Sequence, residues 1–304
     1  MKRIYPLMLA AAMLIFFLGA CTATPAPGIT GETPAPDGQL GETPLPPEQT
    51  PTPEPPPAET GKLAAIKAAG KLVLYTCPDF PPFEFVDETD GSIVGADIEI
   101  AKAIAQELGV ELEIKAEDFD DLVSHIAEGR GDISISGITI SEGRLQEVDF
   151  SDPYVDSAQY LILPQNSAIQ TMEDLAGKTI AVAKGYTGAL ILEYEVSQGT
   201  LGDTMTSVIE YPGPSEALED LKDGMADAVI MDKYMALEMA DQNEALLKTI
   251  PLAYENGNVV GEKYGVAVSK GNEPLLEVIN SVIKRLLDSD QVEKWRLQYS
   301  AVES

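Results

Sequence analysis

From residue 62 onward, short apolar segments of strand character alternate with single helices, and this order limits the possible folds more than any other feature. The first series predicts strands at residues 72–75 and 110–114 and helices at 98–108 and 119–128, with Asp97 as a candidate helix cap and Gly109 as a stop. The second series predicts strands at 179–183, 207–211 and 226–231 and helices at 187–196, 215–223 and 233–240, and two last helices follow at 275–287 and 291–299. Strands separated by single helices favour parallel sheets with crossover connections, so two such series predict an α/β fold with two lobes.

Size and charge narrow the class of partner. The chain has 304 residues, of which 44% are hydrophobic, and this is enough for one large core or two moderate ones. Fifty acidic residues against twenty basic ones give a formal net charge of -30. Nucleic acids and anionic lipid surfaces are therefore poor partners, because binding to either depends on neutralising phosphate with Lys and Arg.

The N-terminal 61 residues differ from the rest of the chain. Lys2 and Arg3 precede an apolar run at 7–18, which is too short for a comfortable membrane span and ends in small residues. Residues 1–20 are therefore predicted to be a cleaved export signal, and an uncleaved membrane anchor is the alternative. Residues 22–60 hold 12 of the 22 prolines and no Lys or Arg, so residues 21–61 are predicted to form an extended, disordered tether.

Residues 131–154 carry the pattern of an anion pocket. A short alternating stretch leads into Gly137, Thr139, Ser141 and Arg144. Gly137 permits close backbone approach to a ligand, and the hydroxyl of Ser141 can cap a following helix. Arg144 can form a bidentate pair with a carboxylate. The alternative is a surface turn in which Arg144 pairs with a neighbouring glutamate.

The sequence GITISEGR followed by VDFSDPY closely resembles the signature of the amino-acid-binding proteins of ABC importers, solute-binding protein family 3. The segments LVLYTCPDFPPFEF, VGADIEIAKAIAQELGVELE, AVAKGYTG, ADAVIMD and EKYGVAVSKG follow in the order of that family, and together they span roughly residues 62 to 300. The resemblance implies a two-lobed periplasmic-binding-protein type II fold, with two mixed sheets flanked by helices and a two-strand hinge. It implies a large lobe at 62–161 plus 262–304 and a small lobe at 162–261, with the crossing strands at 160–163 and 264–268.

The resemblance also implies a ligand site between the lobes. In the family, Gly137, Thr139 and Arg144 would hold the ligand's α-carboxylate, and Asp232 would pair with its ammonium group; Asp232 can alternatively cap the helix that follows. The remaining positions are the small-lobe turn, two aromatic residues around the ligand side chain, and two residues of the large-lobe loops. These are Gly185, Tyr186 and Thr187; Phe80 and Phe119; and Cys77 and Ser136.

Cys77 departs from the family pattern, because many relatives have Asp or another polar residue there. Without that acid, the pocket is expected to prefer a neutral or polar amino acid over lysine or arginine, unless Asp79 compensates. The thiol of Cys77 has no expected partner, and burial in the turn is favoured over a redox or metal role. His125 is expected on a helix surface, and no cofactor or metal site is expected.

The functional expectation is a lipid-anchored, extracytoplasmic receptor that passes an amino acid to the permease of an ABC importer. Leu18-Gly19-Ala20-Cys21 resembles a bacterial lipobox, which implies lipidation of Cys21 and membrane attachment through the lipid alone. The receptor is expected to be a monomer. It is not expected to be an enzyme, because the sequence contains no Walker A, GxSxG or HExxH motif. Two alternatives are a dehydratase of prephenate-like carboxylates, with Glu84 or Lys184 facing the cleft, and a sensing module for a separate signalling partner.

Overall fold

The computed structural model describes residues 61–300. The predicted signal peptide at 1–20, Cys21 and the predicted tether up to residue 60 lie outside the described residues. Within the described range, no helix combines the length and the apolar character that a membrane crossing requires.

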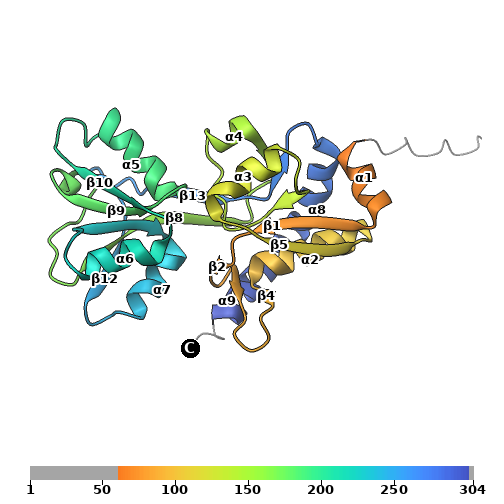
Figure 1. Ribbon diagram of the computed structural model, residues 1–304, viewed down its shortest axis with the longest axis horizontal. Coiled ribbons are helices and arrows are strands. Elements are labelled where there is room, and N and C mark those ends of the chain that lie inside the picture. Colours follow the sequence, from red (N-terminus) through yellow and green to blue (C-terminus); the bar gives the residue numbers. More distant parts are fainter. Residues whose placement is uncertain (1–60, 301–304) are drawn as a thin grey trace, which may run out of the picture. The chain divides into compact units, whose positions relative to one another are not determined.

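The first lobe is built on a mixed five-stranded sheet (Figure 1). Its strand order is β5 (Glu111–Ala116), β1 (Lys71–Thr76), β6 (Ile133–Ser134), β14 (Ala267–Ser269) and β7 (Val148–Phe150). β1 runs parallel to β5 and β6, whereas β14 is antiparallel to β6 and β7. Because β14 lies late in the chain, this sheet is assembled from two separated stretches of sequence.

The helices of this lobe are α1 (Lys62–Ala69), α2 (Ala96–Leu108), α3 (Phe119–Ala127), α4 (Arg144–Glu147), α8 (Glu273–Asp288) and α9 (Gln291–Ser300). The predicted cap of α2 was wrong. The helix begins after Gly95, whose φ of 129° and whose approach to the Phe83 carbonyl leave no room for a Cβ atom. Asp97 is the second residue of the helix and is fully buried. The predicted stop was correct, because Gly109 closes α2 with φ of 70°.

A small antiparallel sheet is an addition that the sequence pattern did not predict. It joins β2 (Asp79–Phe80), β3 (Glu84–Val86) and β4 (Ile93–Val94). β3 places Glu84 and Phe85 inward, and the chain between β2 and β3 brings Phe83 into the core.

The second lobe is built on another mixed sheet, with the order β10 (Ser207–Tyr211), β9 (Thr179–Ala183), β11 (Ala228–Asp232), β8 (Val155–Pro164) and β12 (Leu247–Pro251). A short 3-10 helix, η1 (Glu173–Leu175), lies between β8 and β9, and α5 (Thr187–Ser197), α6 (Pro214–Lys222) and α7 (Lys233–Asp241) connect the strands that follow. β11 is buried along its whole length, which explains its nearly continuous apolar sequence.

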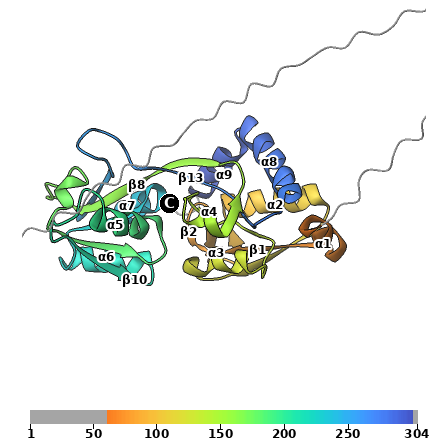
Figure 2. The ribbon, with the colours of Figure 1, turned by 90° about the horizontal axis from the view of Figure 1, so that it is seen from above.

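The connection between the lobes consists of β8 and β13 (Gly261–Tyr264), which run beside each other in Figure 2. β13 pairs antiparallel with residues 155–158 of β8. The crossing was predicted a few residues later, at 160–163, but those residues pair with β11 and β12 inside the small-lobe sheet. The hinge pairing therefore begins where β8 leaves the first lobe.

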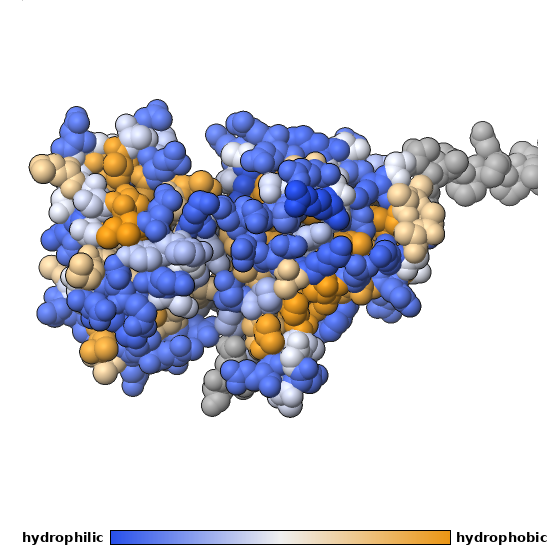
Figure 3. Space-filling view, in the orientation of Figure 1, coloured by the Kyte–Doolittle hydropathy of each residue, from blue (hydrophilic) through white to orange (hydrophobic). Residues whose placement is uncertain are grey.

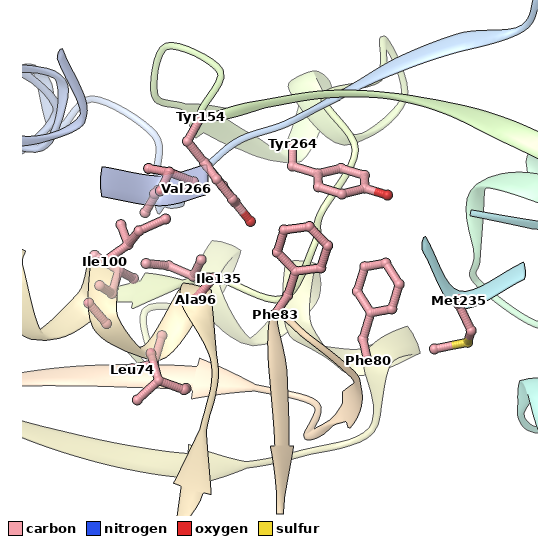
Figure 4. Close-up of a cluster of buried hydrophobic side chains, with 14 of the residues drawn as sticks. Leu74, Phe80, Phe83, Ala96, Ile100, Ile135, Tyr154, Met235, Tyr264 and Val266 are labelled. Carbon is pink, nitrogen blue, oxygen red and sulfur yellow. The ribbon is translucent and has the colours of Figure 1, made fainter. Parts of the chain in front are cut away.

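Aromatic side chains form the part of the core that faces the hinge (Figure 4). Phe83 and Tyr264 are fully buried, with ring centroids 5.6 Å apart, and Phe80 lies 5.2 Å from Phe83. The outer surface is mostly hydrophilic on the face drawn in Figure 3, as the acidic composition leads one to expect.

Candidate functional site

Arg144 is the central cation of the candidate site. Its side chain is buried, with 7% of the residue exposed, although it begins a helix of only four residues. Nη1 donates to the carbonyl of Thr139 at 2.9 Å, and Nη2 donates to the carbonyl of Gly185 at 3.0 Å. The second bond joins the two lobes. The alternative of a surface ion pair with a neighbouring glutamate does not describe this geometry, because both partners are main-chain oxygens.

The guanidinium group of Arg144 also lies 5.4 Å from the ring centroid of Phe119, the first residue of α3. Burial lowers the pKa of Arg144, while the negative charges of Asp232 and Glu262 act in the opposite direction. An ionised guanidinium at this depth attracts an anion strongly, since little water screens it.

The hydroxyl groups of Thr139 and Thr187 make a second link between the lobes. Thr187 Oγ1 donates to Thr139 Oγ1 at 2.9 Å, and Thr139 Oγ1 donates to Glu262 Oε2 at 2.9 Å. Gly185, just before α5, has φ of 76°, and a Cβ atom there would lie 2.4 Å from a carboxylate oxygen of Asp120. The turn before α5 thus needs glycine to come this close to α3.

Asp232 stands at the end of β11 and at the start of α7, as predicted. It occupies the N-cap position, but its side chain makes no capping hydrogen bond. Instead, Oδ1 accepts from Nε2 of Gln159 at 2.7 Å, and the same nitrogen donates to Glu262 Oε2 at 2.8 Å. Burial, followed by the nearby charge of Glu262, raises the pKa of Asp232, and Arg144 partly offsets this rise.

The predicted aromatic residues lie in two separate parts of the site: Phe119 lies beside Tyr186, and Phe80 lies beside Gly137. Phe119 stacks on Tyr186 with centroids 4.4 Å apart, and the Tyr186 hydroxyl donates to Asp79 at 3.2 Å. The ring of Phe80 lies against the turn at Gly137, where an added Cβ atom would come within 2.3 Å of that ring. The thiol of Cys77 is buried as expected, and burial together with the charge of Asp79 raises its pKa.

Ser136 and Gly137 are held from behind by two buried carboxyl groups. Ser136 Oγ accepts from the amide of Cys77 at 2.9 Å and donates to Glu84 Oε1 at 2.7 Å. The amide of Gly137 donates to Asp97 Oδ2 at 2.8 Å, and the hydroxyl of Tyr154 donates to the same oxygen at 2.7 Å. Burial raises the pKa of Asp97 to about 6 and that of Glu84 well above its usual range.

A cavity of about 370 Å³ adjoins this site at the junction of the lobes. Its lining combines Cys77 and the stacked rings of Phe119 and Tyr186 with four aspartates and one lysine. The charged residues are Asp79, Asp118, Asp120, Asp121 and Lys184. Lys184 pairs with Asp120 at 2.6 Å, and both side chains are largely exposed.

The structure thus brings the predicted carboxylate-binding and ammonium-binding positions together around Arg144, and it places Phe80 and Ser136 in the supporting layer behind them. Sequence reasoning missed Gln159 and Glu262, which connect Asp232 to Thr139. The sequence held one indication of Glu262. Glu262 and Tyr264 are two residues apart, so in a strand they point to the same face, and the buried apolar residues 266–268 follow directly.

His125 was predicted on a helix surface, and this prediction was wrong. Its ring is buried, packs edge-on against Tyr75 at 5.5 Å, and Nε2 lies 2.8 Å from Nη1 of Arg130. Among residues 61–300, no group of three or more His, Cys, Asp or Glu side chains is placed to hold a metal ion.

Comparison with known proteins identifies the relatives of this fold. In sequence, the chain is 31% identical over 244 residues to the L-cystine-binding protein TcyJ of Escherichia coli, covering 78% of this chain and 87% of the relative. It is 29% identical over 293 residues to the glutamine-binding protein GlnH of Bacillus subtilis, covering 94% of this chain and 93% of that protein.

In structure, an amino acid ABC transporter substrate-binding protein from Streptococcus pneumoniae, bound to L-arginine, matches with a TM-score of 0.69 and 34% identity, covering 77% of this chain and 96% of that one. This match confirms the predicted two-lobed fold. The model of the bacterial extracellular solute-binding proteins, family 3, matches residues 72–301, and the chain belongs to that family.

Proposed function

We propose that the protein captures an amino acid between its two lobes and presents it to the permease of an ABC importer. The observation that carries this proposal is the presence, at one buried site, of the guanidinium group of Arg144 from the first lobe and the carboxyl group of Asp232 from the second, close enough to influence each other electrostatically. An α-amino acid carries the complementary charges on neighbouring atoms. A zwitterion of this kind matches the site better than a simple anion or cation does.

Closure of the lobes is the proposed mechanism of capture. Arg144 and Thr139 would take the ligand's carboxylate first, and the small lobe would then bring Gly185, Thr187 and Asp232 to complete the site. The contacts of Arg144 with Gly185 and of Thr187 with Thr139 support a site shared by both lobes, because the groups that would hold the carboxylate meet across the lobes. The hinge strands β8 and β13 absorb the motion.

The resemblance puts the lobe boundaries at residues 62–161 plus 262–304 and at 162–261; because residues 159–161 of β8 pair with β11, we propose that the first boundary lies a few residues earlier, near residue 158. The set of ligand-contacting residues stays a proposal in the same sense. Phe119 and Tyr186 lie where a ligand side chain would extend toward the cavity, whereas Phe80 supports Gly137 from below.

Two features favour different ligand side chains. The buried, protonated thiol of Cys77 favours a neutral or polar amino acid, because no carboxylate occupies that position. The four aspartates of the adjoining cavity favour a cationic side chain instead, and this second candidate is supported by relatives that bind arginine. Asp120 is already paired with Lys184, and burial raises the pKa of Asp79, so both are weakened as partners for a cation. We therefore retain the neutral or polar ligand as the first candidate.

Competition between L-glutamine and L-arginine separates these two candidates. Glutamine is expected to displace arginine from the wild-type protein, and Cys77→Asp is expected to reverse the order while leaving recognition of the common carboxylate intact. A wild-type protein that strongly prefers arginine would assign the side-chain pocket to the aspartates.

The protein is not an enzyme, because its family consists of solute-binding proteins. The placement of the two residues considered for dehydratase chemistry agrees with this. Glu84 is fully buried behind Ser136, and Lys184 is exposed and paired with Asp120.

We further propose that the protein is exported and held at the outer face of the membrane through a lipid on Cys21, and that it works as a monomer. The observation behind the proposed export and lipid anchor is the Leu-Gly-Ala-Cys sequence that ends the N-terminal apolar run. Cys21→Ser is expected to release the protein from membranes, because the large negative charge gives no attraction to anionic lipid. Persistence of the variant in a salt-washed membrane fraction would exclude lipid anchoring.

The proposed function is tested by a thermal-shift screen of the wild-type protein against the twenty amino acids. A ligand present at about 100 times its Kd adds roughly 2.7 kcal/mol to the free energy of unfolding. At least one amino acid is expected to raise Tm in this way, and a screen with no response would overturn the proposal.

A further inference from the structure

Asp232 and Glu262 form a pair of buried carboxyl groups whose spacing is set by strand register. Asp232 on β11 lies opposite Gln159 on β8, and Glu262 on β13 lies opposite Ser157 of the same strand. Residues 157 and 159 share one face of β8, because side chains alternate along a strand. All four side chains therefore project from the same face of β11, β8 and β13, and the pair is a built feature of the hinge.

The side-chain amide of Gln159 forms a hydrogen bond with each of the two carboxyl groups. Nε2 of Gln159 donates one hydrogen to Asp232 at 2.7 Å and the other to Glu262 at 2.8 Å. Glu262 also accepts from Thr139 at 2.9 Å and from the hydroxyl of Tyr264 at 3.2 Å. Asp232 and Glu262 are each only 6% exposed. Two carboxyls that accept from one amide nitrogen lie close enough to repel each other strongly when both are ionised.

The charged groups that face this pair do not supply a second positive charge. Arg144 approaches from α4, but its described hydrogen bonds go to two main-chain carbonyls and to neither carboxyl. Tyr264 on β13 and Tyr186 before α5 face the pair, and the negative charge of Asp232 helps to raise the pKa of both phenols. A proton shared by the two carboxyls lowers the cost of burying them, and a hydrogen bond between them contributes to the raised pKa of Asp232.

An ammonium group can replace that proton. It would donate to both carboxylates at once and supply the single positive charge that the pair needs. Thr139 connects the pair to the carboxylate side of the site, because its hydroxyl bonds with Glu262 and also with Thr187. The carboxylate and the ammonium group of a zwitterion would therefore be bound by neighbouring groups of the protein.

We propose that Glu262 is a second acidic residue of the ammonium site, and that amino acid binding expels one proton from the Asp232–Glu262 pair. This inference rests on the proposed function. In the binding step the O–H bond of the protonated carboxyl breaks, its proton passes to the buffer, and the ligand's N–H groups donate to the two carboxylates. One positive charge leaves the two carboxyl groups as another arrives, so the charge around this pair is conserved, while the ligand's carboxylate enters beside Arg144.

A pH dependence of defined sign follows. Burial and the neighbouring Glu262 raise the pKa of Asp232 in the free protein, and a bound ammonium group would lower it, so between these two values the free protein carries a proton that the complex lacks. Within that window the affinity rises with pH, by about tenfold per pH unit for one proton released. Above the pKa of the free pair, proton release stops and the affinity becomes independent of this pair.

The test is titration calorimetry of the wild-type protein with L-glutamine and with L-arginine, in phosphate and in Tris at the same pH. Proton release makes the observed enthalpy differ between the buffers in proportion to the protons released, and up to one proton is expected. Glu262→Gln is expected to abolish this difference, flatten the pH dependence and weaken binding about tenfold, the loss of one charged hydrogen bond.

Asp156→Asn is the matched control, because it removes one acid from β8 that is exposed and pairs with Lys263. It is expected to leave both the affinity and the proton release unchanged. Tight binding by the wild-type protein with no buffer dependence at any pH from 5 to 8, or full proton release by Glu262→Gln, would overturn the inference while leaving the proposed function in place. Absence of amino acid binding by the wild-type protein would overturn both. The wild-type buffer comparison decides the matter even if Glu262→Gln fails to fold.

Discussion

Arg144→Ala is expected to abolish ligand binding while the protein stays folded. In the structure the guanidinium group is the buried cation that faces the junction of the lobes, and it bonds to the carbonyls of Thr139 and Gly185. Without it, the ligand's carboxylate would enter a closed cleft with no cationic partner. An uncompensated buried charge costs about 3–5 kcal/mol, which corresponds to roughly a 200- to 5000-fold loss of affinity.

The effect on stability is expected to be smaller, because two contributions oppose each other. Loss of charged hydrogen bonds costs about 1.5–3 kcal/mol each. The bond to Gly185 forms only when the lobes meet, and removal of a buried charge recovers the desolvation cost that also lowers the pKa of Arg144. A net loss of about 1–2 kcal/mol is expected, or a Tm lower by about 2–8 °C for a protein of this size.

Calorimetric titration with L-glutamine and L-arginine gives the affinity of this variant, and circular dichroism gives its fold. Arg285→Ala serves as the control, because that arginine is more than half exposed and pairs with Glu107 at 2.9 Å on the outer surface. The control is expected to bind as the wild type does. A folded Arg144→Ala protein with wild-type affinity would refute the assignment of the carboxylate site.

Three further predictions concern the layer behind the site. Gly137→Ala is expected to lower the free energy of unfolding by about 2–4 kcal/mol in urea, because φ is 53° and the new methyl group would meet the ring of Phe80, whereas Gly143→Ala, which has open space, is expected to change little. Asp97 has its pKa raised to about 6 in the folded protein, so the stability that its proton provides is complete below pH 4 and is lost as pH rises through 6. The contribution of Asp97 to the free energy of unfolding should therefore fall by about 3 kcal/mol over this range, and Asp97→Asn should make the overall slope shallower by that amount. Cys77 is expected to resist alkylation at pH 8 in a Cys21→Ser background until urea unfolds the protein, because its thiol is buried and its pKa is raised; rapid labelling of the folded protein would contradict this.

Strongly patterned elements were predictable from the sequence. β9 and β10 have the predicted bounds, and α5 and α7 differ from prediction by one residue at the C-terminal end. These segments are long enough for the spacing of their apolar residues to distinguish a helix from a strand. β2, β3 and β4 have two or three residues each, so their pattern carries almost no information.

Where one sequence motif carries one proposed role, the sequence pointed to residues that the structure brings together. Arg144, Thr139 and Asp232 are of this kind, and their roles stay those that the resemblance implies. Glu262 and Gln159 were not found from the sequence, because they meet Asp232 only through the register of three strands that are distant in sequence. His125 was misassigned for the same kind of reason: its burial depends on Tyr75, fifty residues earlier in the chain, and not on the pattern of its own helix.

Recognition of both ends of a zwitterion at one buried site is the central claim. The most direct measurement compares three ligands by titration calorimetry: the amino acid that gives the largest shift in Tm, its C-terminal amide and its deaminated analogue. The amide lacks the carboxylate that Arg144 would bind, and the deaminated analogue lacks the ammonium group that Asp232 and Glu262 would bind. Each is expected to bind at least about 100-fold more weakly than the parent, since the amide leaves the charge of Arg144 without an anion and the deaminated analogue loses the charged hydrogen bonds to Asp232 and Glu262. Affinity of either analogue equal to that of the parent amino acid would contradict the account.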